Sequence, residues 1–320
     1  MRTGLPASRQ RRQAADYRCG GPEKIQSGQV IHQVMRQQNL SAWLYVTPLM
    51  LVLVPFFLLP TLVVLVASFF ETDGFGGLLP TFTLSNYAEI LTSAQTFHLY
   101  VATLKFAVLT WLFTLIIGFL VAYFLVFHVK NQLLAISLFL ICTIPFWTSN
   151  IIRMISWIPL LGKEGLVNSA LLGTGVIREP LEVLLYSGLA VVIAYVHQLT
   201  IFMVVPIFNS LARIDKRVVE AALDAGASRL DVMRYIIIPM SKSGIALGST
   251  FVISIVMGDF FVVKVMSGGG SASVVSAFYE NVGVLQYPIA AASAVLLTLV
   301  LTAMISLILR VVDIRREITQ

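Results

Sequence analysis

The segment of this 320-residue chain whose residue types and spacing most clearly suggest a function is Val218 to Pro239. It is charged and helix-forming, and long apolar segments lie on both sides of it. Its first half carries Ala221, Ala222 and Ala225, which leave one side of a helix thin. A polar segment between two membrane spans must lie at the membrane surface, because the bilayer core cannot solvate it. We therefore predict a surface that another protein can approach closely.

The spacing of residues in this segment predicts two short helices with a break between them. Asp215 can cap the first helix, and Gly226 stands where a helix C-terminus favours a residue that tolerates positive φ. Ser228 and Asp231 have the spacing of a capping box for the second helix. Pro239 lacks an N–H and clashes with the preceding turn, so we expect the second helix to end there.

Two ionisable residues in apolar stretches, Arg153 and Asp259, form a second group of candidates. An ionisable side chain at membrane depth is costly and is by default a functional-site hypothesis. We predict that both, together with Trp147 and Phe260, belong to a functional site. Two alternatives stay open: Arg153 could extend to the outer interface near Trp157, and Asp259 could make a structural hydrogen bond.

The composition places these residues in a membrane. Hydrophobic residues make up 58% of the chain and charged residues only 12%, which is outside the usual range of soluble domains. The formal charge of +6 comes from separate basic blocks, so we expect no nucleic-acid partner. Cys19 lies in a polar stretch and Cys142 in an apolar one, which predicts free thiols and no disulfide framework.

Motifs for cofactors are missing from the sequence. We find no G-x-x-x-x-G-K-[ST] phosphate-binding loop, and the Gly-rich run Gly268–Gly270 has no lysine just beyond it. The four histidines are scattered and do not show metal-ligand spacing. We therefore expect no cofactor, no metal and no catalytic residues, and any ATP that drives the protein must bind a separate subunit.

The apolar stretches predict an all-α integral membrane protein with about six transmembrane helices. The expected spans cover residues 43–70, 99–127, 133–158, 185–208, 244–266 and 289–309. Basic residues gather in the first forty residues, near residue 130, between residues 213 and 242, and after residue 309. By the positive-inside rule these regions are cytoplasmic, so we expect a multi-pass protein with both termini in the cytoplasm.

The pattern E-A-A-x-x-x-G, followed about a dozen residues later by I-P, resembles the EAA loop of binding-protein-dependent ABC importer permeases. In that family the loop forms a coupling helix that docks into a cleft of the cytoplasmic ATPase. The resemblance implies the same role for a coupling loop at residues 213–240. Its candidate docking residues are Glu220, Ala221, Ala222, Asp224, Gly226, Ala227, Ile238 and Pro239.

Further motifs look like those of the spermidine/putrescine-type ABC permeases. They are I-P-F-W-T-S-N-I-I-R-M-I-S-W (Ile144–Trp157), G-K-E-G-L-V-N (Gly162–Asn168) and M-G-D-F (Met257–Phe260). The resemblance covers most of residues 42–312 and implies a type I importer fold, also called MetI-like, in a bacterial inner membrane. It implies a second similar permease, two cytoplasmic ATP-binding subunits and a periplasmic solute-binding protein as partners, with membrane lipid around the assembly.

With this resemblance the chain is expected to divide into three regions. Residues 1–41 are polar and basic, without apolar periodicity, which predicts a disordered cytoplasmic arm. Residues 42–312 are the predicted transmembrane permease domain, and residues 313–320 are the predicted cytoplasmic tail.

The resemblance implies a transport subunit that is not itself an enzyme and that forms half of the substrate pathway. By the resemblance, a polyamine or a related small organic cation is the expected substrate, and the candidates to line the substrate pathway are Arg153, Trp147, Asp259 and Phe260. An acid such as Asp259 would suit the ammonium groups of a polyamine. Lys264 departs from a plain polyamine permease, so opine-like, amino-acid-like or other small solutes stay an alternative. A more remote alternative, an ion-coupled secondary transporter, would need inverted repeats and several intramembrane acids. An integral membrane enzyme would need clustered His, Asp or Glu at ligand spacing.

Overall fold

A computed structural model of the chain describes residues 46–73 and 75–312. The predicted arm at residues 1–41 and the predicted tail at residues 313–320 therefore lie outside the described residues. Contacts between residues divide the chain into two units, Met1–Val63 and Val64–Gln320.

The first described helix runs from Val46 to Ala67 and has a mean hydropathy of 2.8, which suits a membrane span. Pro55 lies in a π-helical turn within it, η2 (Val54–Leu58), and the helix continues as α3 (Leu59–Ala67). A π-helical turn shifts the backbone bonding by one residue, so a helix can pass a proline without ending.

The second unit is almost entirely helical in its described part. Its long helices are α5 (Ala94–Tyr123), α6 (Gln132–Thr143), α10 (Gly188–Leu211), α14 (Lys242–Gly258) and α17 (Tyr287–Val311). Its short helices are α4 (Ser85–Thr92), α7 (Asn150–Ile155), α8 (Ile158–Leu161), α9 (Leu166–Gly173), α11 (Lys216–Asp224), α12 (Arg229–Val232), α13 (Ile238–Met240), α15 (Phe261–Met266) and α16 (Val274–Gly283). Single turns of other helix types are η3 (Phe124–His128), η4 (Ile144–Trp147), η5 (Glu182–Leu184) and η6 (Met233–Ile237).

A small hairpin follows the first helix. Strand β1 (Glu71–Thr72) pairs antiparallel with β2 (Leu78–Leu79), with Glu71 opposite Leu79. The carboxylate of Asp73 closes the turn, because its Oδ1 accepts from the backbone N–H of Phe75 at 2.8 Å and of Gly77 at 2.7 Å.

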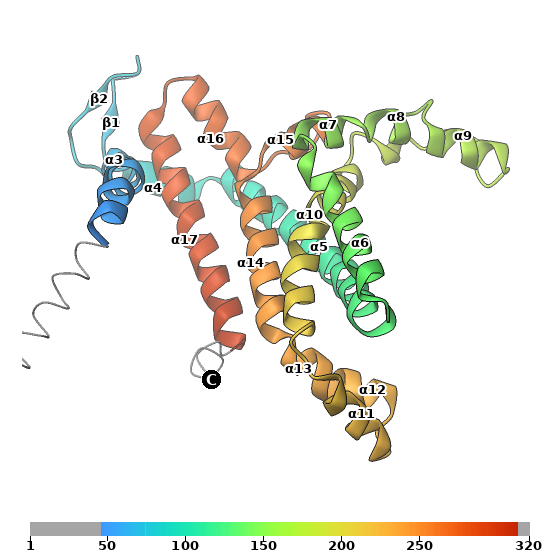
Figure 1. Cartoon of the computed structure of the whole chain (residues 1–320). Helices are drawn as coiled ribbons and strands as arrows, with labels where there is room; N and C mark the ends of the chain where they lie inside the picture. Colours follow the sequence, from blue (N-terminus) through green and yellow to red (C-terminus); the bar gives the residue numbers. More distant parts are fainter. Residues whose placement is uncertain (1–45, 74, 313–320) are drawn as a thin grey trace, which may run out of the picture. The chain divides into compact units, whose positions relative to one another are not determined.

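The described helices agree with the prediction of about six spans. Four are long and apolar enough to cross a membrane: Val46–Ala67, Ala94–His128, Gly188–Leu211 and Tyr287–Arg310. Two bent pairs bring the number to six if each pair is one span: Leu133–Trp147 with Asn150–Gly173, and Arg229–Met240 with Lys242–Gly258. Figure 1 shows α11, α12 and α13 at one end of the bundle, and α7, α8, α9, α15 and α16 at the other. Such a separation is what the positive-inside pattern requires.

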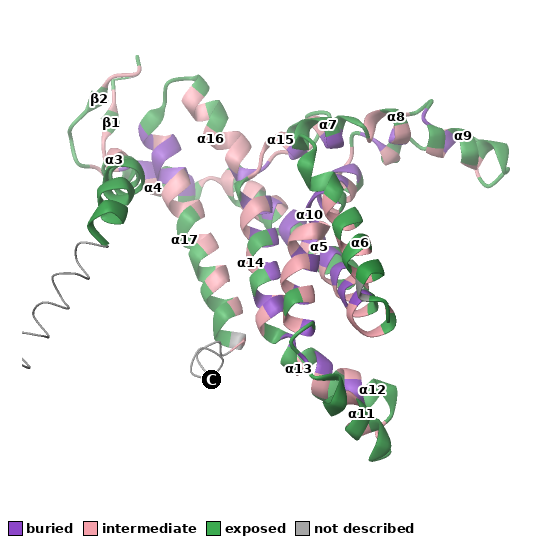
Figure 2. Cartoon of the chain, viewed as in Figure 1, coloured by how far each residue is buried: buried purple, intermediate pink, exposed green. Residues whose placement is uncertain are grey.

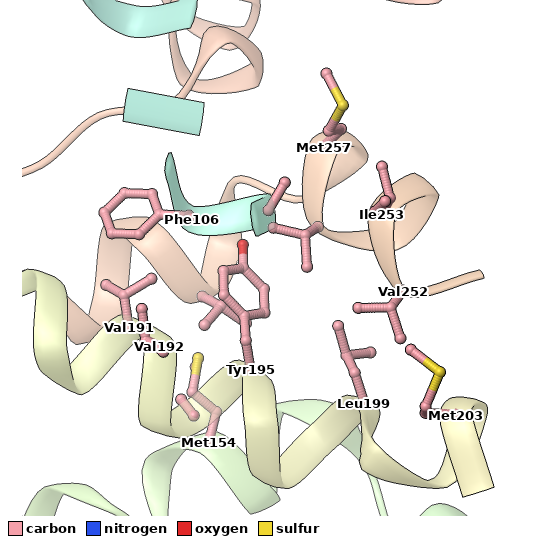
Figure 3. Packing of buried hydrophobic residues seen from close by; sticks show 14 of the residues in the cluster. Phe106, Met154, Val191, Val192, Tyr195, Leu199, Met203, Val252, Ile253 and Met257 are labelled. Carbon is pink, nitrogen blue, oxygen red and sulfur yellow. The ribbon is translucent and has the colours of Figure 1, made fainter. Parts of the chain in front are cut away.

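Helix α10 is the centre of the packing, since it lies against both α5 and α14. Its buried side chains Leu199 and Met203 lie near Val252 of α14, and Tyr195 belongs to the same buried cluster (Figure 3). Figure 2 shows the buried positions concentrated on α5, α10 and α14, while α11 is largely exposed. The bundle therefore has its firmest contacts along α10.

Three glycines allow the close approach of these helices. A Cβ added at Gly244 would lie 2.5 Å from the carbonyl oxygen of Pro206, and one at Gly248 would lie 2.6 Å from the sulfur of Met203. On α5, a Cβ at Gly118 would lie 2.8 Å from Met203 Cγ. Gly244 and Gly248 have the G-x-x-x-G spacing that brings helices together in membranes, where packing and interhelical hydrogen bonds drive association.

Hydrogen bonds between helices add to this packing. Trp111 Nε1 of α5 donates to Ser249 Oγ of α14 at 2.7 Å. The backbone N–H of Val274, at the start of α16, donates to the buried Oγ1 of Thr103 on α5 at 3.0 Å. Such bonds contribute about 0.6 kcal/mol each on average in a membrane protein.

Two predicted spans prove not to be continuous helices. In the third, Thr148 and Ser149 are extended, with ψ of 153° and 135°, and the chain turns by 95° after the 3-10 turn that contains Pro145. In the fifth, α14 ends at Gly258 and Asp259 is extended, with ψ of 137°. The expected span 244–266 is therefore broken. Pro145 predicts the bend in the third span. Hydropathy reveals neither break, because the residues on both sides are apolar.

We predict that Gly244→Ala destabilises the bundle by about 1–3 kcal/mol, because the new Cβ would press on the Pro206 backbone, which cannot rotate away. Thermal unfolding of the purified chain in detergent measures the loss. Gly258→Ala is the matched control on the same helix, since a Cβ there meets no atom within 4 Å. Equal melting temperatures for both variants would contradict the close-packing argument.

Candidate functional site

The first candidate site is the segment between α10 and α14, which the sequence predicted as a helix–turn–helix. Asp215 caps α11, since its Oδ1 accepts from the backbone N–H of Arg217 at 3.0 Å. Gly226 has φ of +89°, as predicted. Its N–H bonds to Leu223 C=O and the N–H of Ala227 bonds to Ala222 C=O, which together form a Schellman motif. The end of α11 is therefore set by hydrogen bonds as well as by the glycine.

A reciprocal capping box begins the second helix of the segment. The backbone N–H of Asp231 donates to Ser228 Oγ at 3.2 Å, and the N–H of Ser228 donates to Asp231 Oδ2 at 3.1 Å. The Ser228 hydroxyl also donates to Asp231 Oδ2, at 2.6 Å. The hydrogen bond from the Ser228 hydroxyl lowers the pKa of the Asp231 carboxyl below its ordinary value, and the bond from the Ser228 backbone N–H lowers this pKa further. These hydrogen bonds therefore stabilise Asp231 as the carboxylate.

The prediction that the second helix ends at Pro239 is wrong. The helical path runs from Arg229 to Met240 and breaks only at Ser241, where the chain bends by 65° into α14. A π-helical turn, η6, precedes the proline and is closed by a bond from Ile238 N–H to Met233 C=O. This shift of the bonding pattern accommodates the ring and the missing N–H.

Near Gly226, the side chains that the coupling loop exposes are small or acidic. Glu220, Ala221, Asp224 and Gly226 are exposed, whereas Ala222 and Ala227 are half-buried against the core. Ile238 is exposed and Pro239 half-buried. Large apolar side chains also reach the surface here: Leu223, Leu230 and Tyr235. Sequence reasoning did not single these three out, although helical spacing on α11 and α12 could have indicated their outward face.

The second candidate site surrounds Asp259, at the break between α14 and α15. Its Oδ1 accepts from the backbone N–H of Val262 at 2.9 Å and from the hydroxyl of Tyr195 on α10 at 3.3 Å. The hydroxyl of Ser273 donates to its backbone carbonyl at 3.4 Å. Asp259 therefore makes the structural hydrogen bonds that the sequence left as an alternative, and it does so at a half-buried position. Tyr195 was not predicted, because an aromatic residue in an apolar helix has no distinguishing pattern.

Phe260 lies beside Asp259 and packs against Tyr279 of α16, with ring centroids 3.9 Å apart. These rings line a small cavity of about 230 Å³ whose other members include Lys264, Ser276 and Glu280. Tyr279 and Glu280 were not predicted either, since the sequence placed no helix in the loop before residue 289. The lack of basic residues in that loop, noted in the sequence, was the only hint.

Arg153 lies on α7 and is 7% exposed, so it does not extend into solvent. Its Nη2 donates to Asn150 Oδ1, one turn back on the same helix. The side chain lines a separate cavity of about 530 Å³ between α5, α6, α7 and α10. Trp147, on η4, is 85% exposed and contributes nothing to that cavity. The four predicted pathway residues thus do not meet in one site: only Asp259 and Phe260 are neighbours.

No metal centre is found in the described part of the chain, where three or more His, Cys, Asp or Glu side chains nowhere gather in a ligand arrangement. The candidate sites are instead the exposed loop between α10 and α14 and the surroundings of Asp259 and of Arg153.

Residues 114–318 match the family of binding-protein-dependent transport system inner membrane components. The chain belongs to this family. The match begins within α5 and includes the coupling loop, the break at Asp259 and α17. The protein is therefore an inner-membrane transport component.

Individual relatives are permeases. The spermidine/putrescine transport system permease protein PotB of Escherichia coli (strain K12) is 33% identical over 256 residues, which cover 79% of this chain and 91% of PotB. PotB of Salmonella typhimurium (strain LT2) is equally similar, with 87% of its length covered. The inner membrane ABC transporter permease protein YdcU of Escherichia coli (strain K12) is 27% identical over 216 residues, covering 63% of this permease and 68% of YdcU.

Solved structures with the same fold belong to alginate importers. A bacterial alginate ABC transporter in complex with alginate pentasaccharide-bound periplasmic protein matches with a TM-score of 0.69 at 16% identity, over 90% of this permease and 98% of that chain. A second structure of a bacterial ABC transporter that imports alginate gives a TM-score of 0.67 at 17% identity, over 91% and 100%. At such identity the likeness concerns the fold alone, and it confirms the predicted type I importer permease fold.

We predict that Asp259→Asn lowers transport by the assembled permease about tenfold or more. The variant loses the negative charge that is expected to attract an ammonium group of the substrate. The amide oxygen can still accept from Val262 N–H, so α15 keeps its cap. Tyr195→Phe is the comparison variant, because it removes only a neutral donor 3.3 Å away. Its transport rate should change less than about threefold. Uptake into proteoliposomes measures both, with assembly checked by gel filtration. Wild-type kinetics for Asp259→Asn would limit Asp259 to a structural role.

Proposed function

We propose that this permease forms half of the substrate pathway of an ATP-driven importer and docks the ATPase through residues 213–240. The observation that carries the proposal is the coupling loop, in which a capped α11, a Schellman turn and a capped α12 present Glu220, Ala221, Asp224 and Gly226 at the surface. The match to PotB over 91% of that permease supports the same role for the chain as a whole.

The loop is well placed to transmit movement. It connects α10 directly to α14, the two helices that pack against each other at Gly244 and Gly248. Closure of an ATPase pair would displace α11, and the closely packed helices would carry this displacement to Asp259 at the opposite end of α14. The energy belongs to ATP bound by separate subunits, so the permease is a transport subunit and not an enzyme.

We propose a polyamine or a related small organic cation as the substrate. The similarity to PotB, a spermidine/putrescine permease by name, is the main support. The half-buried carboxylate of Asp259 and the aromatic pair Phe260–Tyr279 are groups that attract ammonium ions. Lys264 in the same small cavity favours, as the second candidate, an opine-like or amino-acid-like substrate with a carboxylate of its own.

The proposed assembly contains a second homologous permease, two cytoplasmic ATP-binding subunits, a periplasmic solute-binding protein and surrounding lipid. In it the basic segments at both ends of the chain lie in the cytoplasm, with residues 1–41 as a basic arm and residues 313–320 as a tail. Trp147 stays a proposed pathway residue, and its exposure suits contact with the second permease.

We predict that Gly226→Asp abolishes association with the ATPase, or uptake, and leaves membrane insertion intact. The positive φ of Gly226 strains any side chain, while a Cβ there touches nothing within 4 Å, so the damage stays local. Gly226→Asn should retain more activity than Gly226→Val, because asparagine tolerates this conformation better. Gly173→Asp is the control in another exposed helix, where a Cβ also meets nothing. Wild-type uptake by Gly226→Asp would contradict the docking role.

Co-purification of the tagged permease from membranes, followed by an ATPase assay, tests the proposed function. We expect an ATPase and a second permease to accompany it. We also expect a binding protein loaded with spermidine or putrescine to stimulate hydrolysis more than one loaded with an opine or an amino acid. Stimulation by the latter alone would replace the proposed substrate. A permease that purifies alone, with no effect of ATP, would contradict the importer.

A further inference from the structure

The cavity beside Arg153 is unusual for the charge that it contains. Its wall is built almost wholly of apolar side chains from α5, η4 and α10, such as Phe113, Ile117, Phe146 and Ile193. Arg153 is the only charged residue among those that line it, and none of the lining residues is acidic. A guanidinium in such surroundings is costly unless an anion or a set of carbonyls accompanies it.

The described residues do not supply that partner in full. Arg153 donates from Nη2 to Asn150 Oδ1, and its buried Nε has no hydrogen-bond acceptor within the described part of the chain. The only salt bridge in that part joins Lys163 to Glu182, on an exposed loop. The guanidinium has five N–H groups, so donors remain for a further acceptor. The geometry thus leaves one cation, nine-tenths buried, at the wall of an apolar cavity.

Neighbouring polar groups present donors as well. The indole N–H of Trp157 donates to Nδ1 of His197 at 3.2 Å, so the neutral imidazole carries its proton on Nε2. Gln198 donates from Nε2 to the backbone carbonyl of Asn150 at 3.0 Å, which fixes α7 against α10. Trp157, His197 and Gln198 all line the cavity with Arg153. His197 and Gln198 stand near the middle of the cavity's lining on α10, and the Nε2–H of His197 and the second N–H of Gln198 are the donors left there for an oxyanion.

The remainder of the cavity is suited to hydrocarbon. From His197 its lining on α10 extends eight residues to Leu189 and seven residues to Val204, about 10–12 Å in each direction at the rise of an α-helix. The hydrocarbon of one membrane leaflet is roughly 15 Å thick. An apolar groove of this length on a membrane-spanning helix can hold part of an acyl chain, whereas a soluble anion would leave its apolar wall uncovered.

We propose that this cavity binds an anionic phospholipid, with the phosphate at Arg153 and an acyl chain between α5, α6 and α10. The lipid would supply the acceptor that Arg153 lacks and would fill the apolar groove. This site is independent of the proposed substrate, since Asp259 and Phe260 do not line the cavity. It assigns to Arg153 a role other than the pathway role predicted from the sequence.

The test uses the full transporter complex, purified in mild detergent from membranes that contain phosphatidylglycerol. Retained lipid is measured by native mass spectrometry. Arg153→Gln should lower retained phosphatidylglycerol about tenfold to a hundredfold, as expected for a lost charge-assisted contact. Arg178→Gln is the matched control, because it removes the same charge from an exposed loop. Ile193→Trp keeps the charge but narrows the groove, and it should also lower retention.

A second measurement compares thermal unfolding in nanodiscs of phosphatidylcholine alone with nanodiscs that also contain phosphatidylglycerol. The wild type and Arg178→Gln should gain stability from phosphatidylglycerol, and Arg153→Gln should not. Retention unchanged in both Arg153→Gln and Ile193→Trp would overturn the proposal. So would stabilisation by inorganic phosphate equal to that by lipid, or a carboxylate of the second permease found against Arg153. A changed substrate preference of Arg153→Gln with unchanged lipid retention would overturn the proposal and support the pathway role that the sequence predicted for Arg153.

Discussion

The structure depends on how closely α10 can approach its neighbours. Gly244 and Gly248 leave no side chain between α14 and the backbone of α10, and Gly118 does the same on α5. Because packing and interhelical hydrogen bonds, and not burial from water, hold helices together in a membrane, such contacts contribute much of the association energy. The coupling loop joins α10 to α14, so its position follows from this contact.

Charged and polar groups occur where helices break. Asp259 ends α14 and caps α15 through Val262 N–H, so a single carboxylate satisfies a backbone donor at the place where the chain leaves the helical path. Arg153 follows the bend after Thr148 and lies against α10 through Asn150 and Gln198. Membrane helices tolerate irregular backbone only where protein or water covers it, and both breaks lie beside α10. Function is thus expected at the breaks.

The two ends of the bundle carry different chemistry. The end with α11, α12 and α13 is basic, locally capped and mostly exposed, which suits a protein surface that must dock without large rearrangement. At the opposite end, α15 and α16 bring Phe260, Tyr279 and Glu280 together around a small polar cavity. Between them run helices whose buried side chains are mostly apolar, with a few Thr, Ser and Gln side chains among them. Such a division suits a permease that receives movement at one end and substrate at the other.

The sequence alone determined the class of fold, the apolar segments and the two capped helices between residues 213 and 240, because these depend on local composition and spacing. Capping at Asp215, Ser228 and Asp231 and the positive φ of Gly226 could be predicted, since each involves residues within four positions of one another. The course of the chain past Pro239 could not, because a π-helical turn depends on the energy of the whole helix. Contacts across the fold were also out of reach. The bond of Asp259 to Tyr195 joins residues 64 positions apart, and the cavity at Arg153 is formed by four helices. Apolar helices look alike in sequence, so only tertiary packing decides which of their faces meet.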